Sequence, residues 1–374
     1  MATNTIKQLL TEGQSVWQDD ISRDMLNSGL LQQRIDEVGI RGVTSNPSIF
    51  QKAIASGDAY DEDITRLLGD NLAVEEVFQT LAVKDIQDAC DLFRPIYDES
   101  NGEDGFVSLE VLPSLARDTQ GTMENARILW SAVDRPNLMV KVPGTIEGAP
   151  AIEELLYEGL NINVTLLFSL ENYERVAQAF ISALIRRNDE GKPIDRIASV
   201  ASFFVSRVDT TADKLLEKVG TEEALALKGK VAVANAQLAY EVFQKLFGSD
   251  QWRGLEAAGA RVQRPLWAST GVKNPDYSDV LYVETLIGPD TVNTMPVATI
   301  EAFLDHGTVA RTVDADYEGA HAVVDALAAT GVSLDEITAK LETDGIDAFV
   351  KSFDDLLAGV EGKRQSLAQV AGDN

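Results

Sequence analysis

Cysteine and histidine are scarce in this chain. Among 374 residues there is one cysteine, Cys90, and there are two histidines, His306 and His321. A single cysteine cannot form an internal disulfide, which fits the reducing cytoplasm. With so few soft ligands we expect no metal site. Because no glycine-rich nucleotide loop is present either, we also expect no cofactor.

Positive charge and long apolar runs are scarce as well. Lys and Arg total 32 against 60 Asp and Glu, so the formal net charge is −28. Such a surface repels nucleic acid and anionic membranes. No apolar stretch approaches the roughly 20 residues that a membrane-spanning helix needs. We therefore expect no nucleic-acid or membrane partner, while a few cations in a pocket leave a phosphorylated substrate possible.

Short apolar or β-branched runs alternate with longer amphipathic stretches. The short runs predict strands at Ser15–Asp19, Gly42–Ser45, Phe106–Val111, Leu138–Val142, Asn161–Phe168, Ile197–Val205, Arg264–Ser269 and Val292–Met295. Helical periodicity predicts helices at Leu72–Phe93, Thr119–Val133, Ile152–Glu158, Asn172–Arg187, Glu222–Phe247 and Tyr277–Leu286. Two further helices, Tyr317–Thr330 and Leu334–Leu357, are predicted after the last strand.

Eight strands separated by helices indicate the α/β class and a closed (β/α)8 TIM barrel. An open doubly wound sheet is the alternative, but it usually has a glycine-rich turn after its first strand. Here Asp19-Asp20-Ile21-Ser22-Arg23 follows instead. We predict a single domain over residues 1–374, with the additional C-terminal helices wrapping the carboxyl end of the barrel. Residues after Glu361 are expected to fray.

Two charged residues interrupt apolar strands of the predicted barrel. Lys141 lies within Leu138–Val142, and Glu110 lies within Phe106–Val111. Both faces of a barrel strand are buried, and a desolvated lysine has a lowered pKa and a nucleophilic amine. The alternatives for Lys141 are a structural ion pair or a strand that ends one residue early. Glu110 is either a proton shuttle or the partner that balances the charge of the lysine.

Further polar residues stand at strand ends, where barrel enzymes carry their catalytic groups. Asn161, Asn163 and Thr165 share one face of their strand and predict a polar pocket. Pro47 keeps Asn46 out of helical geometry, so the Asn46 amide either points into the barrel mouth or caps a helix. Asp19 and Asp20 end the first strand.

Two cations follow later strands. Arg207 comes just after the sixth strand, where a helix begins, and this combination suits a phosphate group. Lys273 follows the seventh strand through Gly271, which permits close backbone approach. Barrels often bind phosphate after their last strands. Ordinary surface charge is the alternative for both residues.

Four segments of the chain together resemble the transaldolase family, in the order that the family has them. They are Val43–Ser48 (VTSNPS), Val140–Thr145 (VKVPGT), Asn161–Ser169 (NINVTLLFS) and Trp267–Pro275 (WASTGVKNP). The resemblance is to the longer bacterial branch. It implies a cofactor-free transferase of the pentose phosphate pathway that passes a dihydroxyacetone unit from a ketose phosphate to an aldose phosphate through a lysine Schiff base. It implies a cytoplasmic monomer or homodimer with phosphorylated sugars as partners.

The resemblance also implies roles for individual residues. Lys141 would form the Schiff base, and Asp19 rather than Asp20 would be the acid/base. Glu110 and Thr165 would hold the water used in protonation and dehydration. The remaining residues would bind substrate: Asn46 and Asn163 its hydroxyls and the enamine, Ser202 and Ser269 the channel wall, and Arg207 the phosphate.

Two features bear on the choice of reaction. The family often has an arginine shortly after the serine of the seventh strand, where this chain has Lys273, so Lys273 is predicted as a second phosphate ligand. Related aldolases that release free dihydroxyacetone tend to carry Gln and Tyr where this chain has Glu110 and Phe204, which favours transfer over release. A phosphosugar-binding barrel without catalysis is the third alternative.

Overall fold

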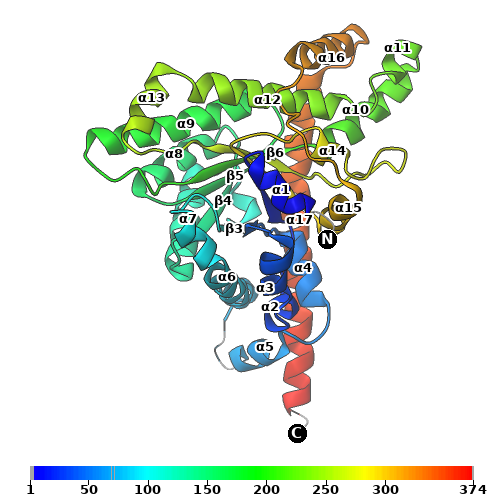
Figure 1. Cartoon of the computed structure of the whole chain (residues 1–374). Helices are drawn as coiled ribbons and strands as arrows, with labels where there is room; N and C mark the ends of the chain where they lie inside the picture. Colours follow the sequence, from blue (N-terminus) through cyan, green and yellow to red (C-terminus); the bar gives the residue numbers. More distant parts are fainter. Residues whose placement is uncertain (1–3, 69, 71, 373–374) are drawn as a thin grey trace.

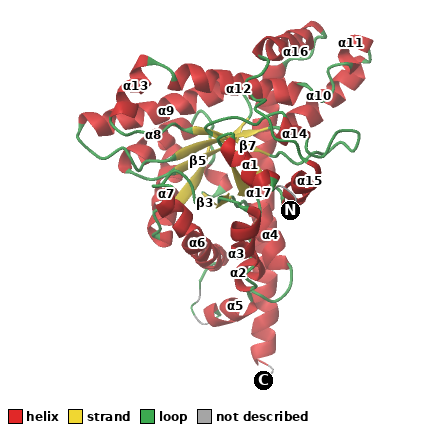
Figure 2. Ribbon diagram, in the orientation of Figure 1, coloured by secondary structure: helices red, strands yellow, loops and turns green. Residues whose placement is uncertain are grey.

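A closed barrel of eight parallel strands forms the centre of the molecule (Figure 1, Figure 2). The computed structural model describes residues 4–68, 70 and 72–372. Each strand pairs with its neighbours in chain order, and β8 closes on β1. The strands are β1 Gln14–Gln18, β2 Gly42–Val43, β3 Val107–Glu110, β4 Leu138–Pro143, β5 Ile162–Leu167, β6 Ser199–Phe204, β7 Arg264–Ala268 and β8 Thr291–Met295. The predicted (β/α)8 barrel is confirmed.

Helices surround the barrel and follow its strands. They are α1 Thr5–Thr11, α2 Arg23–Asn27, α3 Leu30–Gln33, α4 Pro47–Ala55, α5 Asp61–Leu67, α6 Val74–Glu99, α7 Thr119–Val133, α8 Gly148–Glu158, α9 Leu170–Asp189, α10 Ser206–Val219, α11 Glu222–Leu225, α12 Val231–Phe247, α13 Asp250–Ala257, α14 Leu281–Glu284, α15 Val297–His306, α16 Tyr317–Ala329 and α17 Leu334–Gly372. Short polar side chains start several of them: the Ser169 hydroxyl accepts the Asn172 N–H at 3.2 Å and begins α9 directly after β5.

Two predicted helices are broken or shortened in the structure. Residues Glu222–Phe247 form α11 and α12 rather than one helix, because Gly229 adopts a φ of +72° and interrupts the helical path. Of Tyr277–Leu286, only Leu281–Glu284 is helical. The Tyr277 hydroxyl instead donates a hydrogen bond of 2.6 Å to Asp213, and this bond holds the segment against α10.

The helix α17 has 39 residues and runs along the length of the molecule (Figure 1). It packs on α4, α5, α6 and α10. The expected fraying after Glu361 is wrong, because the helix continues to Gly372. Side chains beyond Glu361 anchor it: Lys363 Nζ binds Asp61 Oδ1 at 2.7 Å, and Arg364 donates to the Leu72 carbonyl at 2.8 Å.

A continuous hydrophobic core fills the space between barrel and helices, with Trp17 and Trp267 fully buried. At the amino end of the barrel Asp104 accepts from the Ser15 hydroxyl at 2.5 Å and from the Trp17 indole at 2.9 Å, and pairs with Arg41 at 3.0 Å. This buried cluster closes the end opposite the predicted site. None of the helices in the described part of the chain has the length and apolar character that crossing a membrane requires.

Candidate active site

A cavity of about 390 Å³ opens at the carboxyl ends of the strands. Nearly all the predicted site residues line it, although they come from elements spread over the whole chain: Asp19, Asn46, Lys141, Thr165, Ser202, Phe204, Arg207, Ser269 and Lys273. Glu110 and Asn163 lie behind this wall. Carboxyl ends of parallel strands converge in a barrel, which is why residues so distant in sequence meet here.

Lys141 projects from β4 and is 5% exposed. Its Nζ lies 2.9 Å from the Ser45 carbonyl oxygen and 3.2 Å from Glu110 Oε2. The register aligns Glu110 of β3 with Lys141 of β4, and Lys141 with Asn163 of β5. The Lys141 amine is thus ion-paired and also faces the cavity, and its role as a nucleophile stays a prediction.

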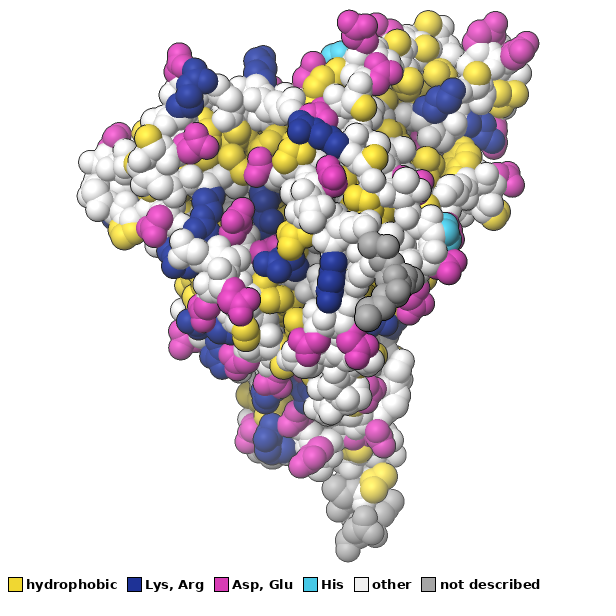
Figure 3. All heavy atoms as spheres, viewed as in Figure 1, with side chains coloured by type: hydrophobic (Ala, Val, Ile, Leu, Met, Phe, Trp, Pro, Cys, Tyr) yellow, Lys and Arg dark blue, Asp and Glu magenta, His cyan; other side chains and the backbone are white. Residues whose placement is uncertain are grey.

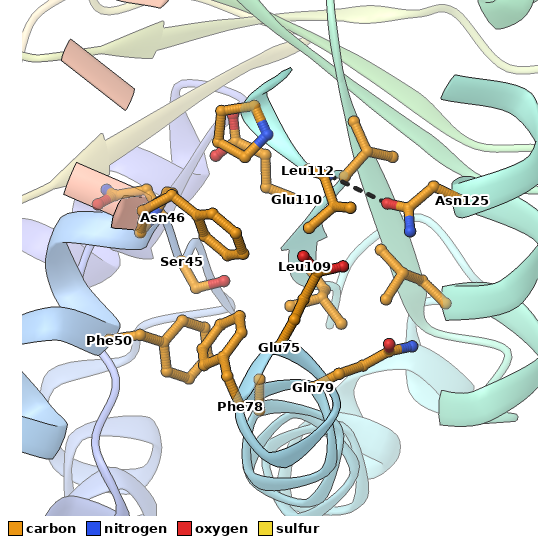
Figure 4. Close-up of a pocket in the computed structure, with 16 residues that line it drawn as sticks. Ser45, Asn46, Phe50, Glu75, Phe78, Gln79, Leu109, Glu110, Leu112 and Asn125 are labelled. Carbon is orange, nitrogen blue, oxygen red and sulfur yellow. Dashed lines mark hydrogen bonds between the residues drawn. The ribbon is translucent and has the colours of Figure 1, made fainter. Parts of the chain in front are cut away.

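Glu110 stands between two cavities. Burial raises the pKa of Glu110 above its usual value, while the neighbouring Lys141 ammonium opposes that rise. Behind Glu110 lies a smaller, more apolar cavity between β3, α4, α6, α7 and α17, with Phe50 and Phe78 on its wall (Figure 4). A carboxyl group with a raised pKa can hold or release a proton beside Lys141, as a proton shuttle must.

Asp19 follows β1, and its amide continues the ladder by donating to the Met295 carbonyl at 2.9 Å. Burial raises the pKa of Asp19, and the Thr44 hydroxyl, which donates to Oδ1 at 2.7 Å, opposes this rise. Asp20 is not among the residues that line the cavity. The structure thus places Asp19 in the cavity wall rather than its neighbour.

Asn163 is fully buried beneath the cavity. Its Nδ2 donates to Ser108 Oγ at 2.9 Å, and its Oδ1 accepts from the Ser202 hydroxyl at 2.7 Å. Asn161, which directly precedes β5, donates instead to the carbonyls of Pro136 and Leu138 near the amino end of the barrel. The predicted polar pocket on this strand therefore includes Thr165 at its surface, with Asn163 as its base and Asn161 outside it.

The strand β5 is irregular at Thr165. The register between β5 and β6 shifts between Val164 and Leu167, and Leu166 has a φ of +59°. Such a bulge re-aims the side chains beside it, and positive φ in a leucine is strained. Thr165 Oγ1 is buried without a hydrogen-bond partner among the described residues. A buried hydroxyl of this kind fits a bound water or substrate oxygen.

Arg207 lies in the first turn of α10 and points into the cavity. Burial lowers the pKa of the guanidinium below its usual value, and Asp19 and Glu110 oppose this shift. Ser269, after β7, has a φ of +56°, and its hydroxyl lies 3.0 Å from that of Ser206. Lys273 is exposed at the rim.

Asn46 both caps a helix and lies at the barrel mouth, the two alternatives that the sequence left open. Its Oδ1 accepts the Ile49 N–H at 3.1 Å and caps α4, and the residue also lines the cavity. Phe204, at the end of β6, forms an apolar part of the wall and packs on Phe168 with ring centres 5.2 Å apart.

Several wall residues were not predicted. Thr44 and Thr294 have hydroxyls 2.6 Å apart beside Asp19, Lys52 stands on α4, and Phe349 comes from α17. Thr44 directly precedes the Ser45-Asn46-Pro47 turn, which was a usable signal. Nothing local in the sequence distinguishes Phe349 from the other apolar residues of its helix.

The closed parallel barrel and the charged cavity at the carboxyl ends of its strands define a (β/α)8-barrel enzyme. A model of the Transaldolase/Fructose-6-phosphate aldolase family matches residues 16–360. A transaldolase from Thermobifida fusca is 52% identical over 353 residues, covering 94% of this chain and 96% of that protein. Transaldolase 2 from Streptomyces avermitilis is 47% identical over 371 residues, covering 99% of this chain and all of that protein.

The chain therefore belongs to the transaldolase/fructose-6-phosphate aldolase family. The prediction of a transaldolase, a transferase enzyme, is confirmed.

Proposed function

We propose that this chain transfers a dihydroxyacetone unit through a Schiff base on Lys141. The donor is sedoheptulose 7-phosphate or fructose 6-phosphate, and the acceptor is glyceraldehyde 3-phosphate or erythrose 4-phosphate, as in the pentose phosphate pathway. The observation that carries the proposal is the buried Lys141 amine, ion-paired at 3.2 Å with Glu110 and facing the same cavity as Asp19.

In the forward half-reaction the neutral amine of Lys141 adds to the ketose carbonyl, and the carbinolamine loses water to give a protonated imine. Glu110 and Thr165 hold the water that carries protons in these steps, which the partnerless Thr165 hydroxyl supports. Asp19 then takes the proton of the hydroxyl on the fourth carbon. The bond between the third and fourth carbons then breaks, and the electron pair of this bond moves into the imine to form an enamine. The aldose phosphate leaves.

The enamine remains bound until an acceptor aldehyde arrives, and the same steps then run in reverse. Asn46 and the Asn163–Ser202 pair orient the substrate hydroxyls, Ser269 lines the channel, and Arg207 with Lys273 binds the phosphate. Phe204 puts an apolar ring in the cavity wall where the related aldolases tend to carry a tyrosine. This ring keeps water from the enamine, so transfer is favoured over release.

Borohydride trapping tests this proposal. Incubation with fructose 6-phosphate and borohydride should attach a reduced three-carbon adduct to Lys141, located by peptide mass spectrometry. Lys141→Ala should fold, give no adduct and lose turnover by several orders of magnitude. Turnover that survives in Lys141→Ala would contradict the mechanism. An adduct that forms without transfer to erythrose 4-phosphate would favour the aldolase alternative, and binding without any adduct would favour the non-catalytic barrel.

We further infer that residues 1–374 form one domain, since one hydrophobic core extends from Ile6 to Val360. The buried single thiol of Cys90 supports a cytoplasmic location. We propose that the protein is a monomer or a homodimer. Because its surface is acidic, we also propose that it has no nucleic-acid partner.

A further inference from the structure

Two aromatic rings hold the Arg207 guanidinium at the cavity. Its central carbon lies 4.9 Å from the centre of the Phe204 ring and 6.0 Å from that of Phe349. Phe204 belongs to β6, whereas Phe349 belongs to α17 and is 7% exposed. All three residues line the same cavity. A residue from the C-terminal helix is therefore part of the wall beside this cation.

The helix α17 contacts the mouth of the barrel at two points. Ser352 Oγ lies 2.9 Å from the Ser48 hydroxyl on α4. Gly345 approaches the bulge of β5, since a Cβ there would lie 3.0 Å from Leu166 Cδ2 and 3.8 Å from Arg207 Nη1. Because glycine allows this close approach, the next turn of the helix brings Phe349 over the guanidinium. Figure 1 shows α17 running past α4.

The electrostatics explain why rings suit this position. Arg207 feels Asp19 and Glu110 across the cavity, but among the described residues no carboxylate is within ion-pair distance of it. A carboxylate partner would occupy guanidinium N–H groups and offset the charge. An aromatic face attracts the cation and fixes its plane without taking any N–H donor. The donors stay available for the forked hydrogen bonds that a phosphate accepts.

We propose that Phe349 is a positioning residue of the phosphate subsite, which orients Arg207 together with Phe204 and makes α17 part of that subsite. This inference rests on the proposed function, in which Arg207 binds the substrate phosphate. It adds a contribution from a helix that follows the complete barrel in sequence.

Phe349→Leu is the decisive variant, because leucine keeps apolar bulk and removes the aromatic face. We expect the KM for fructose 6-phosphate and the inhibition constant of inorganic phosphate to rise together by about 3- to 10-fold. The kcat value should stay within about twofold, since the reacting atoms are not touched. Phe349→Tyr, which keeps the ring, should restore both constants.

Phe353→Leu is the matched control. Phe353 lies one turn later on α17 and packs edge-on against Phe78, with ring centres 5.6 Å apart, away from Arg207. It should leave both constants unchanged. Unphosphorylated D-glyceraldehyde, offered as acceptor with saturating fructose 6-phosphate, should show the same KM with wild type and Phe349→Leu.

Arg207→Ala separates failure of this inference from failure of the proposed function. If Arg207→Ala raises the phosphate constants while Phe349→Leu does not, the role of Phe349 is overturned and the phosphate assignment stands. If Arg207→Ala leaves the constants unchanged, the phosphate assignment itself fails. A Phe349→Leu effect that is equal for phosphorylated and unphosphorylated substrates, with a lower melting temperature, would also overturn the inference, because it indicates a packing role alone.

Discussion

Single hydroxyl groups tune the carboxylate Asp19. Burial raises the pKa of this carboxylate, while the hydrogen bond from Thr44 at 2.7 Å lowers it. The Thr44 hydroxyl in turn lies 2.6 Å from that of Thr294 on β8. An acid/base group works best when its pKa lies near the working pH, so opposing influences of this kind suit the proposed role.

Replacing Thr44 by valine should raise the pKa of Asp19 further, because a donor to the charged form is lost. We expect the acidic limb of the kcat/KM profile for fructose 6-phosphate to move upward by about one pH unit. The measurement is a pH–rate profile of both proteins. Thr80→Val is the control, since the Thr80 hydroxyl bonds only to Glu76 O of its own helix, α6. An unmoved acidic limb would show that Asp19 is not the group titrated.

At the scale of elements, one turn of α10 joins the helices and loops on that side of the barrel. Asp209 accepts the Ala232 N–H at 2.7 Å and the Tyr282 hydroxyl at 2.9 Å. Asp213 accepts the Gly229 N–H at 3.1 Å and the Tyr277 hydroxyl. These bonds fix the start of α12 and the segment after Lys273, so the two carboxylates hold elements that border the phosphate side of the cavity.

Asp209 should make the stability of this corner depend on pH. Burial raises its pKa from 3.8 to about 6. The folded state then binds the proton more tightly than the unfolded state, so this contribution to stability is complete below pH 4 and is lost as pH rises through 6. The loss amounts to about 3 kcal/mol at most. In Asp209→Asn this dependence should vanish, because asparagine stays neutral.

Urea unfolding of wild type and Asp209→Asn between about pH 4 and about pH 7 measures the difference. The free energy of unfolding of the wild type should fall relative to that of the variant across this window. Asp118→Asn, at the exposed start of α7, provides a comparison with an ordinary helix cap. Parallel curves for wild type and Asp209→Asn would contradict the raised pKa.

At the scale of the whole molecule, negative charge is in large excess. The net charge is −28, and acidic and basic side chains are interspersed over the face seen in Figure 3. Self-repulsion of such a chain destabilises the compact state. Against this background Arg207, Lys273 and Lys52 gather cationic groups at the cavity, as the proposed binding of a phosphorylated substrate requires.

Salt should stabilise this protein by screening the repulsion. We expect the melting temperature at neutral pH to rise by a few degrees when NaCl increases from about 10 mM to about 300 mM. Near pH 5, where part of the carboxyl groups are protonated, the rise should be smaller. Differential scanning calorimetry checks both. A melting temperature that falls with salt would mean that specific ion pairs outweigh the net repulsion.

Many features of the fold and the site were predictable from short stretches of sequence. Strand runs, helical periodicity and the polar residues at strand ends such as Lys141, Asn46 and Arg207 are local signals. They predict a barrel with its site at one end, because convergence of strand ends follows from closure. The helix boundaries at Gly229 and near Tyr277 were not predictable in this way, since a positive φ and a hydrogen bond to Asp213 decided them.

By itself the sequence determined the barrel and the family, and it predicted Lys141 as the Schiff-base residue. Only the tertiary structure decided that Glu110 meets Lys141, that Asp19 rather than Asp20 enters the cavity, and that Asn163 supports Ser202 from below. It also brought Phe349 to Arg207. The physical reason is that strand register, a bulge and the path of a long helix fix these contacts, and each of them depends on groups far apart along the chain.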